Sequence, residues 1–123
     1  MGVFGSMAEQ DAIDIVRQQV EAFNARDLDC FLGTYATHAE VSGLQPHPII
    51  GRSALRDFYS GSFQDSSAHC EVTSLMRVGE RWVVAHENVS NSHQSTETIA
   101  MFEVIDDVIT KAALFKAPPT PIP

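Results

Sequence analysis

The first half of the chain carries hydrophobic residues at helical spacing. Residues 8–25 repeat an apolar side chain every three or four positions, which predicts an amphipathic helix. A second, shorter apolar stripe follows Asp27, a residue type that caps helix N-termini. A third stripe, at residues 53–60, precedes Gly61, which we expect to end that helix. The pattern predicts three helices, with a short strand at residues 39–44 between the second and the third.

From residue 68 the hydrophobic pattern alternates with a period of two, which is typical of strands with one buried face. Turn-forming residues separate the alternating runs at Gly79-Glu80 and at Asp106-Asp107. The four runs span residues 68–78, 81–92, 95–105 and 108–116. Helices followed by a meander of antiparallel strands predict an α+β fold, in which the helices pack on one face of a curved sheet.

The two ends of the chain differ in composition from the middle. We interpret residues 1–6, MGVFGS, as a remnant of cloning, with Met7 as the native start. Residues 117–123 contain four prolines, which exclude a helix or a central strand, so we expect an extended tail. No repeat or linker interrupts residues 7–116, which we expect to form a single domain.

Charge narrows the classes of function. Sixteen acidic residues against eight basic ones give a net charge of -8, whereas binding to nucleic acid or to an anionic membrane surface needs a basic face. No apolar stretch is as long as a membrane span and no secretion signal precedes the first helix, so we expect a cytoplasmic protein. Cys30 and Cys70 are too few for a disulfide framework, and we expect both to be buried.

Four short segments carry more specific information. They are FNARDLD at residues 23–29, YA at 35–36, GRSALRDFY at 51–59 and FEVIDDVI at 102–109. With these segments the chain resembles the nuclear transport factor 2-like superfamily over residues 10–116, and within it the polyketide cyclase and ketosteroid isomerase branch. The resemblance implies a cone-shaped, curved antiparallel sheet wrapped around three helices, a cystatin-like α+β barrel, with an apolar pocket inside.

The resemblance also implies a homodimer formed through the outer face of the sheet. It does not choose an activity, because this fold is shared by isomerases, dehydratases, epoxide hydrolases, polyketide cyclases and non-catalytic binders.

Three catalytic positions of the ketosteroid isomerases are replaced in this chain. The position of their proton-abstracting base is Gly43, that of their oxyanion-binding tyrosine is Gln19, and that of their oxyanion-binding carboxylic acid is Ala100. Because Gly43 cannot move a proton and Ala100 cannot donate a hydrogen bond, we do not expect steroid isomerisation by that mechanism. Tyr59 matches a tyrosine that supports the oxyanion network, and is either a catalytic candidate or a core aromatic residue with a satisfied hydroxyl.

Strand parity indicates which other side chains reach the pocket. If Ala100 faces inward, Thr98 and Phe102 face inward as well, because alternate residues share a face. The same alignment predicts that Glu87 points outward. It places five residues of the preceding strand inward: Trp82, Val84, His86, Asn88 and Ser90.

His86 is the first candidate for general acid–base catalysis, because an imidazole titrates near neutral pH. The alternatives are a hydrogen-bonded core histidine, or an outward histidine if the register slips by one residue. His47, between two prolines, falls at the expected mouth of the pocket, where a solvated loop histidine is the alternative. No histidine pair has the spacing of zinc ligands, so we expect neither a metal nor a cofactor.

Two functions therefore stay open. The first is a cofactor-free isomerase, cyclase or hydrolase that uses His86 and Tyr59 for acid–base chemistry on a small apolar or neutral organic ligand. The residues expected to bind and orient this ligand are Asn88, Ser90, Thr98, Trp82, Phe102 and His47. The second is a non-catalytic ligand-binding or dimeric interaction module. An acidic residue in the pocket would favour the enzyme, and the parity above places none there.

Overall fold

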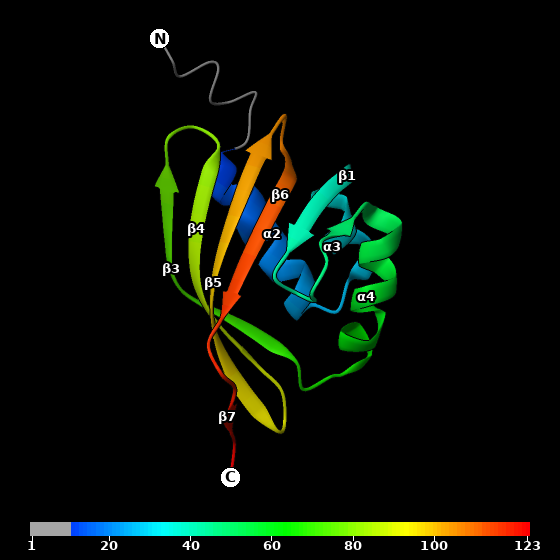
Figure 1. Ribbon diagram of the computed structural model, residues 1–123, viewed down its shortest axis with the longest axis vertical. Coiled ribbons are helices and arrows are strands. Elements are labelled where there is room, and N and C mark those ends of the chain that lie inside the picture. Colours follow the sequence, from blue (N-terminus) through cyan, green and yellow to red (C-terminus); the bar gives the residue numbers. More distant parts are fainter. Residues whose placement is uncertain (1–10) are drawn as a thin grey trace.

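The elements run from helices to strands along the chain, as the hydrophobic pattern predicts. The computed structural model describes residues 11–123, so the interpretation of residues 1–6 lies outside the described part (Figure 1). The helices in this part are α2 (Ala12–Asn24), α3 (Leu28–Gly33) and α4 (Arg52–Gln64). The strands are β1 (Tyr35–Ser42), β2 (Ile49–Ile50), β3 (His69–Val78), β4 (Trp82–Ser90), β5 (Gln94–Ile105), β6 (Val108–Lys116) and β7 (Thr120–Pro121). The predicted α+β class is confirmed.

Capping side chains explain where α2 and α3 begin. The Ile13 N–H donates to the Asp11 carboxylate at 3.3 Å, and the Cys30 N–H donates to the Asp27 carboxylate at 3.0 Å. Each contact satisfies a backbone donor that has no partner within the first helical turn. Cys30 itself is exposed on α3, so the expectation of a buried Cys30 is wrong, whereas Cys70 is buried.

Helix α4 continues beyond Gly61, so the prediction that this glycine ends the helix is wrong. The reason is Phe63, whose ring centroid lies 5.4 Å from that of Phe23 and 5.0 Å from that of Phe31. These contacts hold the last turn of α4 against α2 and α3. They offset the poor helix propensity of glycine, which costs about 1 kcal/mol relative to alanine.

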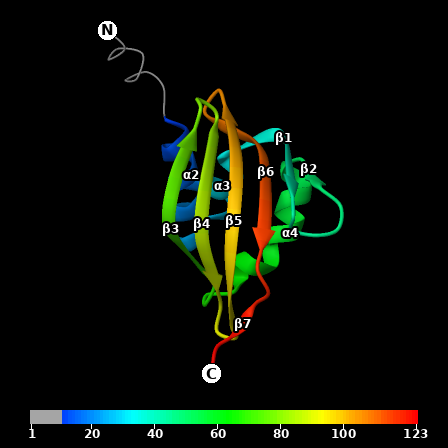
Figure 2. The ribbon, with the colours of Figure 1, turned by 60° about the vertical axis from the view of Figure 1, so that its left-hand side comes forward.

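The seven strands of residues 11–123 form one curved, open sheet. Its order is β2-β1-β6-β5-β4-β3, and β7 pairs with the beginning of β5. Neighbouring strands are antiparallel except β1 and β6, which run parallel, so the expected antiparallel sheet is mixed at this point. Helix α2 lies behind β4, β5 and β6 on the concave side, and α4 lies beside β1 and β2 (Figure 1 and Figure 2). The sheet thus wraps around the helices without closing.

A hydrophobic cluster fills the space between the helices and the inner face of the sheet. Val16 from α2 and Phe31 from α3 are buried in it. Val83 on β4 and Phe102 on β5 meet them from the sheet side. Burial of such side chains stabilises a fold by about 1.5–3 kcal/mol each. The cluster thereby fixes the inner face of the sheet, on which the candidate site lies.

The side chains of β4 that face the helices are not the ones predicted but the alternate set. Ala85 pairs with Ala100 and Glu87 pairs with Thr98, and directly paired residues of antiparallel strands point to the same face. Thr98 and Ala100 are buried as predicted, and so are Ala85 and Glu87. The alternate residues of β4 point to the outer face: Trp82, Val84, His86 and Asn88. The predicted inward orientation of these four residues is therefore wrong by one residue of register.

The C-terminal tail, residues 117–123, runs along the sheet and pairs with it. The Ala117 N–H donates to the Glu97 carbonyl and the Ile122 N–H donates to the His93 carbonyl, each at 2.9 Å. Between these two contacts β7 adds a short edge strand to β5. None of the helices in residues 11–123 has the length and apolar character needed to cross a membrane.

Candidate functional site

A cavity of about 310 Å³ lies between the helices and the inner face of β4, β5 and β6. This volume is at the small end of the range for small-molecule sites, about 300–1,000 Å³. Its helical wall is aromatic, with Phe23, Phe31 and Tyr59, and its sheet wall carries the polar residues Glu87 and Thr98. An apolar cavity with a few polar groups is the usual form of a site for a small organic molecule.

Packed rings hold Tyr59 in the wall of the cavity. Its ring centroid lies 4.8 Å from that of Phe31 and 5.3 Å from that of Phe58, both in edge-to-face geometry, which aromatic pairs prefer. Burial raises the pKa of the Tyr59 hydroxyl well above its ordinary value, so the hydroxyl stays protonated. Within residues 11–123 this hydroxyl meets no hydrogen-bond partner, and it is free to donate to a ligand.

A hydrogen bond fixes a second phenol, Tyr35, in the same cavity. The Gln19 side-chain amide donates to the Tyr35 hydroxyl oxygen at 3.1 Å. Because that oxygen accepts, the hydroxyl proton remains available, and no acceptor in the described part of the chain meets it. Tyr35 is only 1% exposed, and burial raises its pKa as well. Two protonated phenols therefore line the cavity, each able to donate to an oxygen atom of a ligand.

Glu87 brings a carboxyl group into this cavity. The residue is 5% exposed and lies on the inner face of β4, opposite Thr98. Burial raises the pKa of Glu87, and the thiol of Cys70 opposes this shift by donating a hydrogen bond to the carboxylate. Glu87 therefore keeps its proton to higher pH than a carboxyl group in water does.

The signal that places Glu87 in the cavity lies in the turn between β4 and β5. The Asn91 side-chain oxygen accepts from the N–H groups of His93 at 2.8 Å and Gln94 at 3.0 Å, and the Asn91 N–H donates to the Gln94 carbonyl at 2.9 Å. A turn closed in this way sets the register of the hairpin, and pairs counted from it put Glu87 opposite Thr98. Sequence reasoning missed Glu87 because it took the parity of β4 from an alignment rather than from this turn.

The structure brings four of the predicted site residues together and leaves the others outside. Tyr59, Ser90, Thr98 and Phe102 line the cavity, and their roles in binding or catalysis stay predictions. His47 lies exposed in the loop between β1 and β2 and is not part of the cavity lining.

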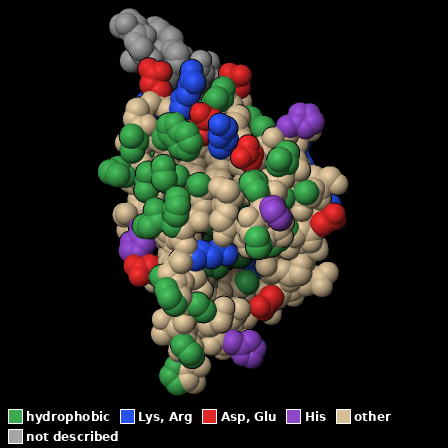
Figure 3. Space-filling model, in the orientation of Figure 1, with side chains coloured by type: hydrophobic (Ala, Val, Ile, Leu, Met, Phe, Trp, Pro, Cys, Tyr) green, Lys and Arg blue, Asp and Glu red, His purple; other side chains and the backbone are tan. Residues whose placement is uncertain are grey.

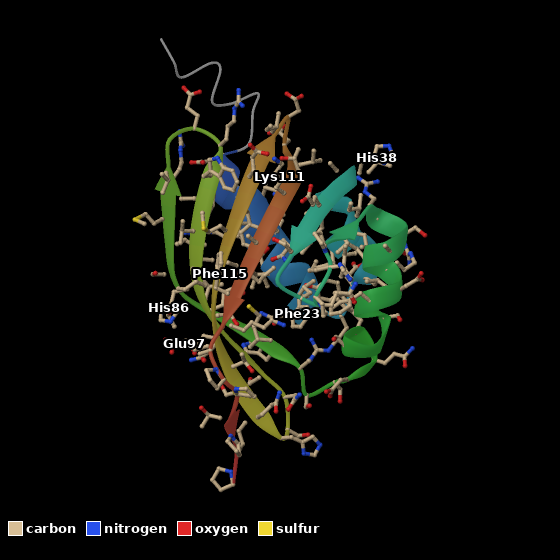
Figure 4. The ribbon with its side chains drawn as sticks, viewed as in Figure 1. Phe23, His38, His86, Glu97, Lys111 and Phe115 are labelled. Carbon is tan, nitrogen blue, oxygen red and sulfur yellow. The ribbon has the colours of Figure 1, made fainter. Side chains whose placement is uncertain are left out.

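His86 lies on the outer face of the sheet, away from the cavity. Its Nε2 atom is 2.6 Å from the Oε2 atom of Glu97, and Figure 4 shows the two side chains next to each other, away from Phe23. The hypothesis that His86 is an acid–base group inside the pocket is therefore wrong. Trp82 and Asn88 share its face and do not line the cavity.

Backbone contact closes the position that the ketosteroid isomerases use for their base. Gly43 has a φ of +94°, and a Cβ atom added there would overlap the carbonyl oxygen of Leu114. Glycine is the residue that fits so close an approach of two backbone segments. A carboxylate at this position would require the end of β1 to move away from β6. Within residues 11–123, no group of three or more His, Cys, Asp or Glu side chains is arranged to hold a metal ion.

Comparisons with known proteins agree with this fold. The model of the SnoaL-like domain matches residues 16–112. No sequence among the curated proteins matches the chain.

Three solved structures illustrate the structural likeness. One is SalBIII, described as an epoxide hydrolase/cyclase-like enzyme in pyran ring formation in the polyether salinomycin. It is 14% identical to this chain, with a TM-score of 0.77, and the match covers 86% of this chain and 90% of SalBIII. A candidate ketosteroid isomerase from Kribbella flavida is 17% identical, with a TM-score of 0.76, and the match covers 91% of this chain and 82% of the isomerase chain. A SnoaL-like protein of unknown function from Burkholderia thailandensis is 21% identical, with a TM-score of 0.74, and the match covers 87% of this chain and 94% of the Burkholderia chain. At these identities the likeness shows the fold alone.

Proposed function

The chain belongs to the SnoaL-like family of the nuclear transport factor 2-like superfamily, and from this premise we propose that its cavity is the active site of a cofactor-free enzyme. Glu87 exchanges a proton with a small organic ligand, while Tyr35 and Tyr59 donate hydrogen bonds to an oxygen atom of that ligand. The reaction is an isomerisation, a cyclisation or a hydrolysis, since each of these needs a proton to move at a carbon or oxygen atom.

The observation that carries this proposal is the buried carboxyl group of Glu87. Burying a polar group costs free energy unless hydrogen bonds satisfy it, and the Cys70 thiol is only a weak donor. Ionisable groups with raised pKa values inside cavities are concentrated at catalytic sites. The names of two structural neighbours, an epoxide hydrolase/cyclase-like enzyme and a candidate ketosteroid isomerase, fall in the proposed reaction classes.

A test compound that needs no knowledge of the natural substrate shows whether Glu87 moves a proton. In 5-nitrobenzisoxazole a base removes the proton at carbon 3, the nitrogen–oxygen bond breaks, and a coloured cyanonitrophenolate forms. We expect the wild-type protein to accelerate this reaction as the pH rises through a pKa above that of an ordinary carboxyl group. Glu87→Gln is expected to lower this rate by a factor of about 100 or more, which is the usual contribution of a positioned general base.

Glu97→Gln is the matched control, because Glu97 is a glutamate on the neighbouring strand that faces outward. It is expected to keep the wild-type rate. Equal rates for the wild type and Glu87→Gln would contradict proton transfer by Glu87. In that case the alternative function, a ligand-binding module without chemistry, is the better account of the cavity.

We further propose that the chain forms a homodimer through the outer face of its sheet. Figure 3 shows hydrophobic side chains gathered over β3, β4 and β5. Met76, Val78, Ile99 and Phe115 are large apolar residues that remain exposed on this side of the strands. A contiguous exposed apolar patch commonly marks an interaction site. Sedimentation equilibrium at micromolar concentration is expected to show a dimer that Ile99→Asp converts to a monomer, and a monomeric wild type would contradict this interface.

A further inference from the structure

Lys116 places a positive charge at the wall of the cavity. In the described part of the chain it is the only lysine or arginine that lines this cavity. It pairs with Thr98 across β5 and β6, and Thr98 pairs with Glu87 across β4 and β5. The three residues therefore form one row across the inner face. At a strand spacing of about 4.8 Å, the backbone of Lys116 lies about 10 Å from that of Glu87, roughly the length of a small two-ring molecule.

Besides Glu87, Asp65 is an acidic residue that lines this cavity and Glu97 lies on the adjoining strand, and neither of them pairs with Lys116. Glu97 precedes Thr98 in β5, so its side chain points to the outer face, where it contacts His86. Asp65 accepts hydrogen bonds from the Ser67 N–H at 2.9 Å and the Ser67 hydroxyl at 2.6 Å, which lower its pKa, so it keeps its negative charge and is held toward Ser67. Within residues 11–123, Lys116 forms no ion pair.

Lys116 is exposed at the wall of the cavity, and the effective dielectric constant near a protein surface is lower than that of bulk water, so its ammonium group attracts an anion more strongly than an isolated ammonium group in water does. The rest of the surface is acidic, with a net charge of -8 for the chain, and would repel an anion. That repulsion is screened beyond about 8 Å at physiological ionic strength, whereas a contact at Lys116 is not. An anionic group of a ligand is therefore expected at the Lys116 end of the cavity, away from Glu87.

We propose that the cavity selects organic anions, namely aromatic or alicyclic carboxylates whose anionic group lies against the Lys116 ammonium group. The apolar body of such a ligand extends between Phe31 and Phe102 and brings a carbon or oxygen atom to Glu87. This inference rests on the proposed function of the cavity, and it replaces the neutral ligand that the sequence led us to expect.

Two isosteric probes, 2-naphthoate and 2-naphthamide, test the charge preference. Backbone amide shifts in NMR titrations report binding, with Thr98 and Phe102 for the cavity and Ile99 and Met101 for the outer face. We expect both probes to shift the cavity amides and 2-naphthoate to bind about fivefold more tightly, the equivalent of one partly exposed ion pair. Lys116→Gln is expected to abolish this ratio by weakening 2-naphthoate alone.

Lys111→Gln is the matched control, because Lys111 is an exposed lysine on the same strand, is labelled in Figure 4, and does not line the cavity. It is expected to keep the fivefold ratio. Equal affinities for the two probes in the wild type, or an unchanged ratio in Lys116→Gln, would overturn the anion preference and leave the cavity as a ligand site. Probes that shift only Ile99 and Met101, or nothing, would overturn both the ligand site and the preference.

Discussion

Two glutamates on neighbouring strands show how differently the two faces of this sheet act on the same side chain. Glu87 on β4 points inward, is 5% exposed, and has its pKa raised by burial. Glu97 on β5 points outward, has a side chain that is 62% exposed, and contacts His86. The helices cover one face, and no element of residues 11–123 covers the other. Burial, rather than residue type, makes one carboxyl group a candidate catalyst and the other half of a surface ion pair.

The largest expected difference between the faces concerns their phenylalanines. Phe102 is 2% exposed on the inner face, and Phe115 is 60% exposed on the outer face. Phe102→Ala is expected to lower the free energy of unfolding by about 3–5 kcal/mol, because it leaves a cavity in the core. Phe115→Ala in the monomeric Ile99→Asp background is expected to lower it by less than about 1 kcal/mol. Urea denaturation followed by circular dichroism measures both, and similar losses would contradict the assignment of faces.

The two glutamates are expected to differ, by a smaller amount, in how they make the free energy of unfolding depend on pH. Since the folded-state pKa of Glu87 is raised, the folded protein binds the extra proton, so stability falls as pH rises from the ordinary carboxyl range through the raised pKa. Glu87→Gln removes this fall. We expect it to be more stable than the wild type at pH 9 by on the order of 1 kcal/mol and to lose this advantage at pH 4.

Thermal unfolding at the two pH values measures this effect, with Glu97→Gln as the control that changes little at either. If Glu87→Gln and the wild type show parallel pH profiles, the carboxyl group of Glu87 titrates as an exposed one does, and its burial has no electrostatic consequence.

The smallest expected effect is that of the ion pair on the outer face. His86 and Glu97 are 38% and 62% exposed, so water screens their attraction. A double-mutant cycle with His86→Ala and Glu97→Gln is expected to give a coupling energy below about 1 kcal/mol at pH 6. A coupling of several kcal/mol in the monomeric Ile99→Asp background would show that this pair is shielded from water, against its described exposure.

Much of the fold follows from local signals in the sequence. Apolar spacing predicts α2, and Asp27 predicts the start of α3, because a capping carboxylate acts on N–H groups within its own turn. The double Asp106-Asp107 predicts the last hairpin turn, in which both residues have positive φ values of 52° and 64°. Gly61 misleads because aromatic contacts from distant segments, made through Phe63, override its local preference.

The candidate site was harder to predict for a specific reason. In β5 one face is buried and the other is partly polar, so Thr98 and Phe102 identify the inner side. In β4 both alternating sets contain apolar residues, with Val83 and Ala85 on one face and Trp82 and Val84 on the other. Alternation alone therefore cannot orient β4. The outer apolar face, which we assign to a dimer, is the feature that hides Glu87 from sequence reasoning.

The closed position at Gly43 has a stereochemical consequence. Gly43 follows β1, which lies three strand spacings, about 14 Å, from β4 in the sheet order. Under the proposed function, a prochiral ligand receives its proton from the β4 side of the cavity rather than from the β1 side. The handedness of any new stereocentre is then set by the wall that carries Glu87, and a side chain at Gly43 cannot reverse it without separating β1 from β6.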